Sequence, residues 1–257
     1  MPLWVTKEIR RLYPDMAVTS TQFTYTQGAV QHSHTKPVGS VSNIKLPIVC
    51  GPCNNVWMSQ LENRAGRQLV AAIGDTSLTL VPEAQSDIAK WMTLKALTFD
   101  LGEPNPMRVV TDDDLHAFYA TRSPQPQFVV RLARYGEPHL GHLIFFNRRG
   151  YAYPESREDV FAYAQILTLV FGRLVIQSIY VPVANQSLPS VLYRRPIPYD
   201  IVIWPGREES IGWPPPLSLD REKIASYSGL PGNPESFAGQ PAPRKPKKPE
   251  AAPPRKP

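Results

Sequence analysis

Cysteine is scarce in this sequence, with two residues among 257. Two cysteines cannot form the disulfide framework of a small secreted domain, so we expect a reducing compartment. No apolar run approaches the roughly 20 residues that cross a bilayer, and the first residues lack the basic and apolar regions of a signal peptide. These absences predict a cytoplasmic protein with no membrane partner.

Net positive charge is almost missing from the chain before its last residues. The overall charge is +6, and residues 241–257 contain six basic residues against one acid, Glu250, which leaves about +1 for the rest. A basic, proline-rich composition is typical of disorder, so we expect residues 231–257 to be a disordered tail. Such a tail makes weak contacts with polyanions, which makes nucleic acid a candidate partner. The predicted contact residues are Arg244, Lys245, Lys247 and Lys248.

The spacing of apolar residues predicts several helices in the first half of the chain. In residues 54–73 an apolar or small residue recurs every fourth position, Asn54 or Asn55 is suited to cap the start, and Gly74 is suited to end the helix. The other predicted helices cover residues 3–13, 82–99, a short segment from Asp112 with Leu115, Phe118 and Tyr119 facing inward, and 220–227. We interpret the three aspartates at 112–114 as partners of the helix dipole rather than as metal ligands.

β-Structure is predicted mainly after residue 127. Residues 128–135, 140–147 and 201–204 have strand composition, and 162–183 is predicted to form a hairpin that turns near Gly172. A buried helix is the alternative for 160–171, because short apolar runs do not reveal their period. Residues 15–45 are expected to hold short strands or an irregular hairpin. The sequence therefore predicts an α+β fold, in which a mostly antiparallel sheet follows the helical part. It also predicts three regions: a knuckle and helix region at residues 1–74, an α+β domain at 75–230, and a tail at 231–257.

The only two cysteines, Cys50 and Cys53, form a C-x-x-C motif immediately before the predicted helix 54–73. Two cysteines at this spacing can bind one metal ion, or they can form a reversible disulfide at a helix N-terminus. A closed zinc site needs four ligands. His32 and His34 are the nearest candidates, since residues two apart on a strand share a face. The prediction is a His2Cys2 zinc site; the alternative is that both histidines are ordinary exposed residues.

The tetrapeptide Cys50-Gly51-Pro52-Cys53 is identical to the redox motif of thioredoxin. Its surroundings differ, because Val49 stands where thioredoxins normally have a tryptophan. A predicted helix also occupies the place of the strand with a cis-proline. The required β-α-β order is absent from the predicted elements, which disfavours redox catalysis.

Residues 49–62, VCGPCNNVWMSQLE, resemble a group of uncharacterised bacterial proteins with the signature C-x-x-C-N-N-x-W-M-S-x-L-E. The segment is also similar to the C-terminal half of a His-Asn-His (HNH) endonuclease-like, treble-clef-like zinc module. In the complete module another C-x-x-C upstream completes a four-cysteine zinc site. A Glu-His pair follows it, and its histidine acts as the general base in phosphodiester hydrolysis.

This chain has neither an upstream cysteine nor a histidine before His32. Residues 1–5, MPLWV, resemble the string that follows the Glu-His pair in the group, so either Met1 is an internal start or the module has lost half of its site. No catalytic residue is therefore assigned. The prediction is a nucleic-acid-associated HNH endonuclease-like protein, inactive as given, with zinc as its expected cofactor. The alternative is a non-enzymatic protein-interaction protein in which the C-x-x-C is structural only.

Overall fold

The computed structural model describes residues 7–8, 11–12, 19–26, 29–37, 49–103, 108–137, 142–152, 161–182, 199–206 and 208–228. Of the helix predicted for residues 3–13, positions 7–8 and 11–12 are helical. The predicted tail 231–257, with Arg244, Lys245, Lys247 and Lys248, lies outside the described residues.

One long helical rod follows the cysteine motif. It consists of α2 (Gly51–Cys53), the π-helical segment η2 (Asn54–Met58) and α3 (Ser59–Ile73). The predicted helix is confirmed, but the predicted caps Asn54 and Asn55 are wrong. The rod begins earlier because Cys50 is the N-cap residue, and its sulfur accepts a hydrogen bond from the backbone of Cys53. The predicted apolar stripe consists of Trp57, Leu61, Ala65, Leu69 and Ile73. The last four are buried, and Trp57 is half-buried.

The second helix, α4 (Pro82–Leu101), lies between α3 and the sheet. This position explains its composition, since a helix that is covered on several sides is apolar around most of its circumference. Trp91 is 1% exposed and is among the largest fully buried side chains. The prediction of this helix is confirmed, including Pro82 in its first turn.

A third helix, α5 (Asp112–Thr121), begins at the N-cap Thr111, whose hydroxyl accepts a hydrogen bond from the backbone N–H of Asp114. Phe118 is buried, as predicted. The prediction that Tyr119 faces inward is wrong, because Tyr119 is 53% exposed. Adjacent helix residues are rotated by roughly 100°, and α5 buries only the Phe118 side.

The main sheet has the strand order β10-β4-β7-β6-β5, and β8 also pairs with β4. Its strands are β4 (Phe128–Tyr135), β5 (His142–Ala152), β6 (Phe161–Phe171), β7 (Leu174–Tyr180), β8 (Asp200–Trp204) and β10 (Ser218–Leu219). All pairs are antiparallel except that of β10 with β4. The predicted hairpin is confirmed as β6–β7, which turns at Gly172 with a φ of 55°. The alternative of a helix at 160–171 is wrong.

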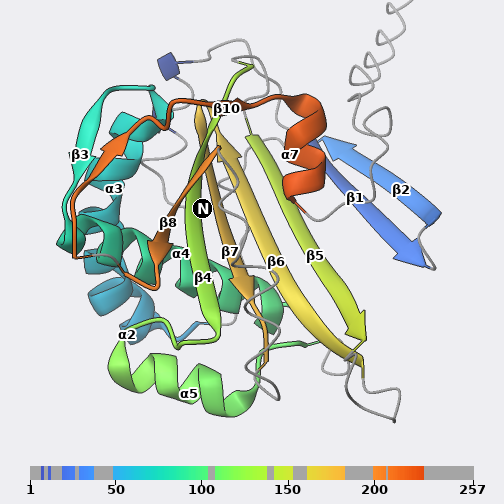
Figure 1. Cartoon of the computed structure of the whole chain (residues 1–257). Coiled ribbons are helices and arrows are strands. Elements are labelled where there is room, and N and C mark those ends of the chain that lie inside the picture. Colours follow the sequence, from blue (N-terminus) through green and yellow to red (C-terminus); the bar gives the residue numbers. More distant parts are fainter. Residues whose placement is uncertain are drawn as a thin grey trace, which may run out of the picture.

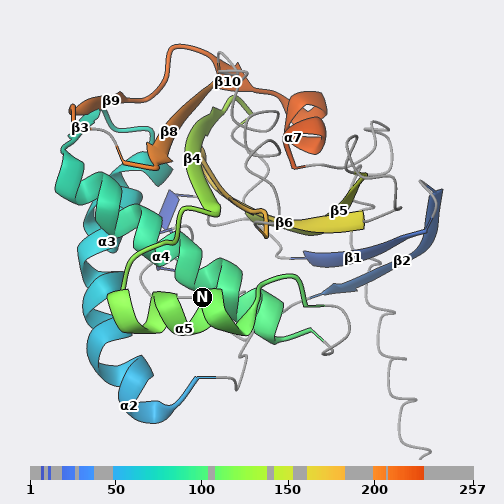
Figure 2. The same cartoon turned by 60° about the horizontal axis from the view of Figure 1, so that its bottom comes forward.

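The two faces of this sheet are covered by different helices. Helices α3, α4 and α5 lie on one side, and the short helix α7 (Arg221–Tyr227) lies on the other (Figure 1 and Figure 2). Side chains alternate accordingly along β4: Leu132 belongs to the core shared with α3 and α4, whereas Ala133 belongs to the cluster under α7. Helices followed by a mostly antiparallel sheet confirm the predicted α+β class.

A second pairing connects distant parts of the chain. Strand β3 (Leu78–Leu80) pairs with β9 (Ile211–Trp213), and Leu78 lies opposite Trp213. Beside it, the amide of the buried Gln85 donates to the backbone oxygens of Leu80 at 2.9 Å and Glu209 at 2.8 Å. The start of α4 is thereby fixed to a segment more than a hundred residues further on.

Strands β1 (Thr19–Thr26) and β2 (Ala29–Pro37) form an antiparallel hairpin with an irregularity between Thr24 and Tyr25. This agrees with the irregular hairpin expected in residues 15–45. Across the described ranges, no helix combines the length and the apolar character needed to cross a membrane.

Candidate functional site

The candidate site is the first turn of the helical rod, where the two cysteines lie. Cys50 has an extended backbone (φ −64°, ψ 148°), and Cys53 is the third residue of the helix. The backbone N–H of Cys53 donates to the sulfur of Cys50 at 3.3 Å. Both cysteines are free; Cys50 is exposed and Cys53 is half-buried. Two thiols therefore occupy one turn at the protein surface. The following segment η2 is π-helical, a conformation frequent at functional sites.

Aromatic and cationic side chains from α5 adjoin this turn. The sulfur of Cys53 lies 4.0 Å from the hydroxyl oxygen of Tyr119. The guanidinium carbon of Arg122 lies 4.1 Å from the ring centroid of Trp57 and 4.0 Å from that of Tyr119. A cation stacked on two rings in this way holds helices together. Arg122 thus connects the end of α5 to the start of the rod.

These neighbours change the acidity of one thiol. The hydrogen bond with Cys50 lowers the pKa of the Cys53 thiol below its ordinary value, while its partial burial acts in the opposite direction. Tyr119, Trp57 and the positive charge of Arg122 lower the pKa further. The thiolate is the form that binds metals and attacks disulfides. The site therefore favours the reactive form of Cys53.

The sequence predicted two further zinc ligands, His32 and His34. Both belong to β2, where His32 lies opposite Thr24 and His34 opposite Gln22. Strand β2 lies on the opposite side of the molecule from α2 in both views (Figures 1 and 2). The side chains of the two histidines lie outside the described residues, so their role as ligands stays a prediction.

Zinc fits the cysteine pair as one half of a site. Two thiols from one helical turn match the ligand chemistry of structural zinc, which takes four ligands, usually Cys or His. Within the described part of the chain, no group of three or more His, Cys, Asp and Glu side chains is placed to hold a metal ion. The pair alone can bind a metal and orient it, but it leaves coordination positions to other groups.

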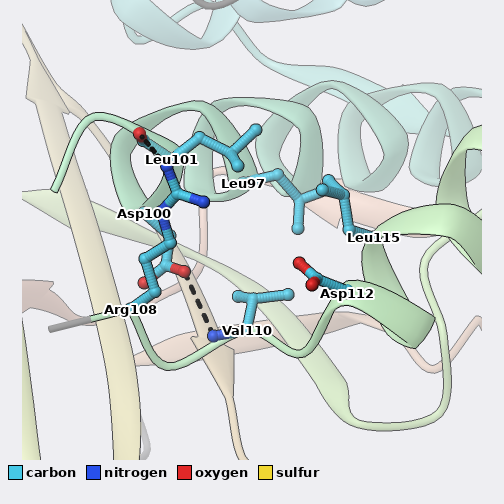
Figure 3. Close-up of a pocket in the computed structure, with 7 residues that line it drawn as sticks. All are labelled: Leu97, Asp100, Leu101, Arg108, Val110, Asp112 and Leu115. Carbon is cyan, nitrogen blue, oxygen red and sulfur yellow. Dashed lines mark hydrogen bonds between the residues drawn. The ribbon is translucent and has the colours of Figure 1, made fainter. Parts of the chain in front are cut away.

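A hollow between the end of α4 and the start of α5 is a weaker candidate (Figure 3). The space in it for a water-sized molecule is about 10 Å³, which is roughly the volume one water needs. The buried carboxylate of Asp100 accepts hydrogen bonds from the backbone N–H groups of Val109 and Val110, at 3.1 Å each. Arg108 Nη2 donates to the carbonyl of Leu101 at 3.2 Å. These bonds fix the 108–110 segment onto α4, so we assign the hollow a structural role.

A polar cluster lies under α7 on the opposite face of the sheet. Arg131 Nη1 is 3.0 Å from a carboxylate oxygen of Asp200, and Arg131 Nε donates to the side-chain oxygen of Gln177 at 2.8 Å. The guanidinium carbon also lies 4.3 Å from the ring centroid of Tyr227. Burial raises the pKa of Asp200, and Arg131 acts in the opposite direction. This cluster connects β4, β7, β8 and α7, so we assign it a structural role.

Sequence reasoning located the cysteine pair but missed the role of Arg122. The contact between Cys53 and Tyr119 joins residues that are 66 positions apart. A local sequence pattern does not predict such a contact. The left-handed backbone of Arg122 (φ 54°), which ends α5, has no sequence signal either, since it occurs at a residue other than glycine or asparagine. Comparison with protein-family models, curated proteins and solved structures found no match for this chain.

Proposed function

We propose that this chain is a nucleic-acid-associated protein of the HNH endonuclease-like group, with an incomplete module that does not cleave nucleic acid. The observation that carries the proposal is the position of Cys50 and Cys53: both are free and lie in the first turn of a long helix that follows a β-hairpin in the chain. In the module that residues 49–62 resemble, this half supplies two thiolates to a structural zinc ion.

The role of zinc in this proposal is structural. A zinc ion bound by Cys50 and Cys53 would fix the start of the rod to the segment that supplies the remaining ligands, and such binding contributes directly to folding. His32 and His34 are the proposed remaining ligands. The Glu-His pair that activates water in the complete module has no counterpart in the sequence before His32. For the chain as given, binding without cleavage is the proposed activity.

Zinc content tests the first part of the proposal. Protein purified without chelators is expected to contain about one equivalent of zinc by elemental analysis, because a closed site binds one ion. Cys50→Ser and Cys53→Ser are each expected to lose it. His32→Ala and His34→Ala should also lose it, whereas His116→Ala, which changes an exposed histidine on α5, should not. Zinc-free wild-type protein would contradict the metal site.

The salt dependence of nucleic-acid binding tests the second part. Each phosphate contact contributes about 0.9 to the slope of log affinity against log salt for duplex DNA. Changing Arg244, Lys245, Lys247 and Lys248 to glutamine should therefore lower this slope by roughly 3–4 in a fluorescence-anisotropy titration. Arg67→Gln, on the exposed side of α3, is the control and should change it by less than about 1. An unchanged slope in the tail variant would show that other residues bind the phosphates.

A second candidate function is a non-enzymatic interaction protein in which the C-x-x-C is structural only. The hydrogen bond from the Cys53 backbone to the Cys50 sulfur favours it, because a helix cap needs no metal. Val56 and Tyr119 near the pair are also 57% and 53% exposed, so they offer apolar surface to a partner protein. The zinc measurement separates the two candidates, since only the HNH-like module requires the ion.

A further inference from the structure

Cys50 and Cys53 lie in one turn, and the sulfur of Cys50 is 3.3 Å from the backbone nitrogen of Cys53. Residues three apart on a helix have Cβ atoms about 5–6 Å apart, whereas a disulfide needs about 3.5–4.5 Å. Cys50 precedes the helix with an extended backbone, and its sulfur already accepts a hydrogen bond from the Cys53 backbone at 3.3 Å. Because Cys50 lies outside the regular helix, its side chain can rotate toward Cys53 without the loss of a side chain from inside the helix.

The two thiols differ in their access to solvent. Cys50 is exposed, whereas Cys53 is half-buried and lies 4.0 Å from the Tyr119 hydroxyl. Apart from its own chain neighbours and the helix backbone, no atom of the described residues lies within 4 Å of the position that a Cβ on Gly51 would occupy. Because Cys50 is exposed, a small molecule can reach it from solvent, and Cys53 lies in the same turn as whatever is attached to Cys50.

We propose that this turn is a modification site, at which Cys50 and Cys53 form a reversible disulfide with a low-molecular-weight disulfide as the oxidant. The Cys50 thiolate attacks one sulfur of that disulfide, a mixed disulfide forms, and one small thiol leaves with the proton from Cys50. The Cys53 thiolate then attacks the Cys50 sulfur, and the second small thiol leaves with the proton from Cys53. The protein loses two electrons and two protons, and the small disulfide gains both.

Disulfide formation also regulates the proposed metal site. Both thiolates are consumed, and a disulfide sulfur is not a zinc ligand of the thiolate kind. The oxidised chain is therefore unable to hold zinc at this turn, and the metal-bound and oxidised states exclude each other. This regulatory part rests on the proposed function, whereas disulfide formation itself does not.

Mass spectrometry of the full chain in mixtures of oxidised and reduced glutathione tests the disulfide. The chain has no other cysteine, so the wild type is expected to lose two hydrogens and to resist alkylation as the oxidised fraction rises. Cys53→Ser should accumulate a mixed disulfide with glutathione at Cys50. Cys50→Ser should accumulate much less, because Cys53 is half-buried, and serine preserves a capping side chain. A wild type that carries two glutathiones, or that remains fully alkylated in the oxidising mixtures, would overturn the proposal.

Zinc content measured on the same samples separates this inference from the proposed function. Zinc is expected to be released in proportion to the disulfide formed, and reduction should restore binding. If the reduced chain binds no zinc but the disulfide forms, the metal function fails and the modification site stands. If the reduced chain binds zinc and no disulfide forms, the modification site fails. If the oxidised chain retains its zinc, the regulatory part is wrong.

Discussion

Trp91→Ala is expected to lower the free energy of unfolding by about 3–5 kcal/mol, the usual cost of removing a large aromatic side chain from a core. Trp91 is 1% exposed and belongs to the cluster that combines α3, α4 and one face of the sheet. Because α4 lies between α3 and the sheet, collapse of one neighbour into the cavity would pull it away from the other. The surrounding structure therefore has little freedom to relax.

Urea denaturation followed by circular dichroism measures this loss. Globular proteins have total stabilities of about 5–15 kcal/mol, so a loss of this size should shift the urea midpoint strongly toward lower concentrations. Trp91→Phe keeps an aromatic ring and should cost less. Leu217→Ala is the matched control, because Leu217 is 43% exposed and surface substitutions usually stay within about 0.5 kcal/mol. A Trp91→Ala loss no greater than that of the control would contradict the central position of α4.

Asp200→Ala is expected to cost a similar amount, about 3–5 kcal/mol, because it leaves the buried cation of Arg131 without its partner. The side chains of Arg131 and Asp200 are only 10% and 3% exposed. Gln177 continues to accept the hydrogen bond from Arg131 Nε, but a neutral amide does not compensate the charge. The loss should therefore exceed that expected from the packing of an aspartate side chain alone.

The double variant Arg131→Met, Asp200→Ala distinguishes the uncompensated charge from lost packing. Removing both charges should recover part of the stability lost in Asp200→Ala, since replacing a whole buried pair by apolar residues is often neutral or favourable. Arg64→Ala is the control, as its ion pair with Asp87 is more exposed, with Arg64 53% accessible, and should cost at most about 1 kcal/mol. If the free energy of unfolding of the double variant is lower than that of Asp200→Ala, the charge explanation is refuted.

Elements with a strong local pattern were predictable from the sequence. The stripe of Trp57, Leu61, Ala65, Leu69 and Ile73 has the period of a helix that packs on one side. The structure buries all of these residues except Trp57, which is half-buried. The β6–β7 hairpin was predictable because β-branched residues flank Gly172, which takes a positive φ in the turn. In these segments, the interactions that decide the structure lie within a few residues.

The wrong predictions concern segments whose structure depends on residues far away in the sequence. The N-cap was expected at Asn54 or Asn55, because the amide side chain is a better cap than a thiol, yet Cys50 caps the helix. No strand was predicted between the first two long helices; β3 forms there because β9, far along the chain, pairs with it. The exposure of Tyr119 depends on what covers α5, which a helical period does not reveal.

The candidate site was predictable to the same limited degree. The spacing of Cys50 and Cys53 placed two thiols in one turn, and the structure does so. The contacts with Tyr119 and Arg122, by contrast, come from α5 and its C-cap, more than sixty residues away. The burial of Arg131 against Asp200 likewise joins β4 to β8, and no pattern in either strand singles out that pair.

The pairing of β3 with β9 has a consequence for synthesis of the chain. On the ribosome, α3, α4 and β4 emerge long before residues 209–213, which supply the partner of β3 and an acceptor for Gln85. Strand β4 pairs with β7 along one edge, but its other edge stays unpaired until β8 and β10 have been synthesised. An uncovered strand edge is a template for pairing with other chains. We therefore expect nascent chains that stop before residue 200 to depend on chaperones, and chains extended past residue 219 to be released from that dependence.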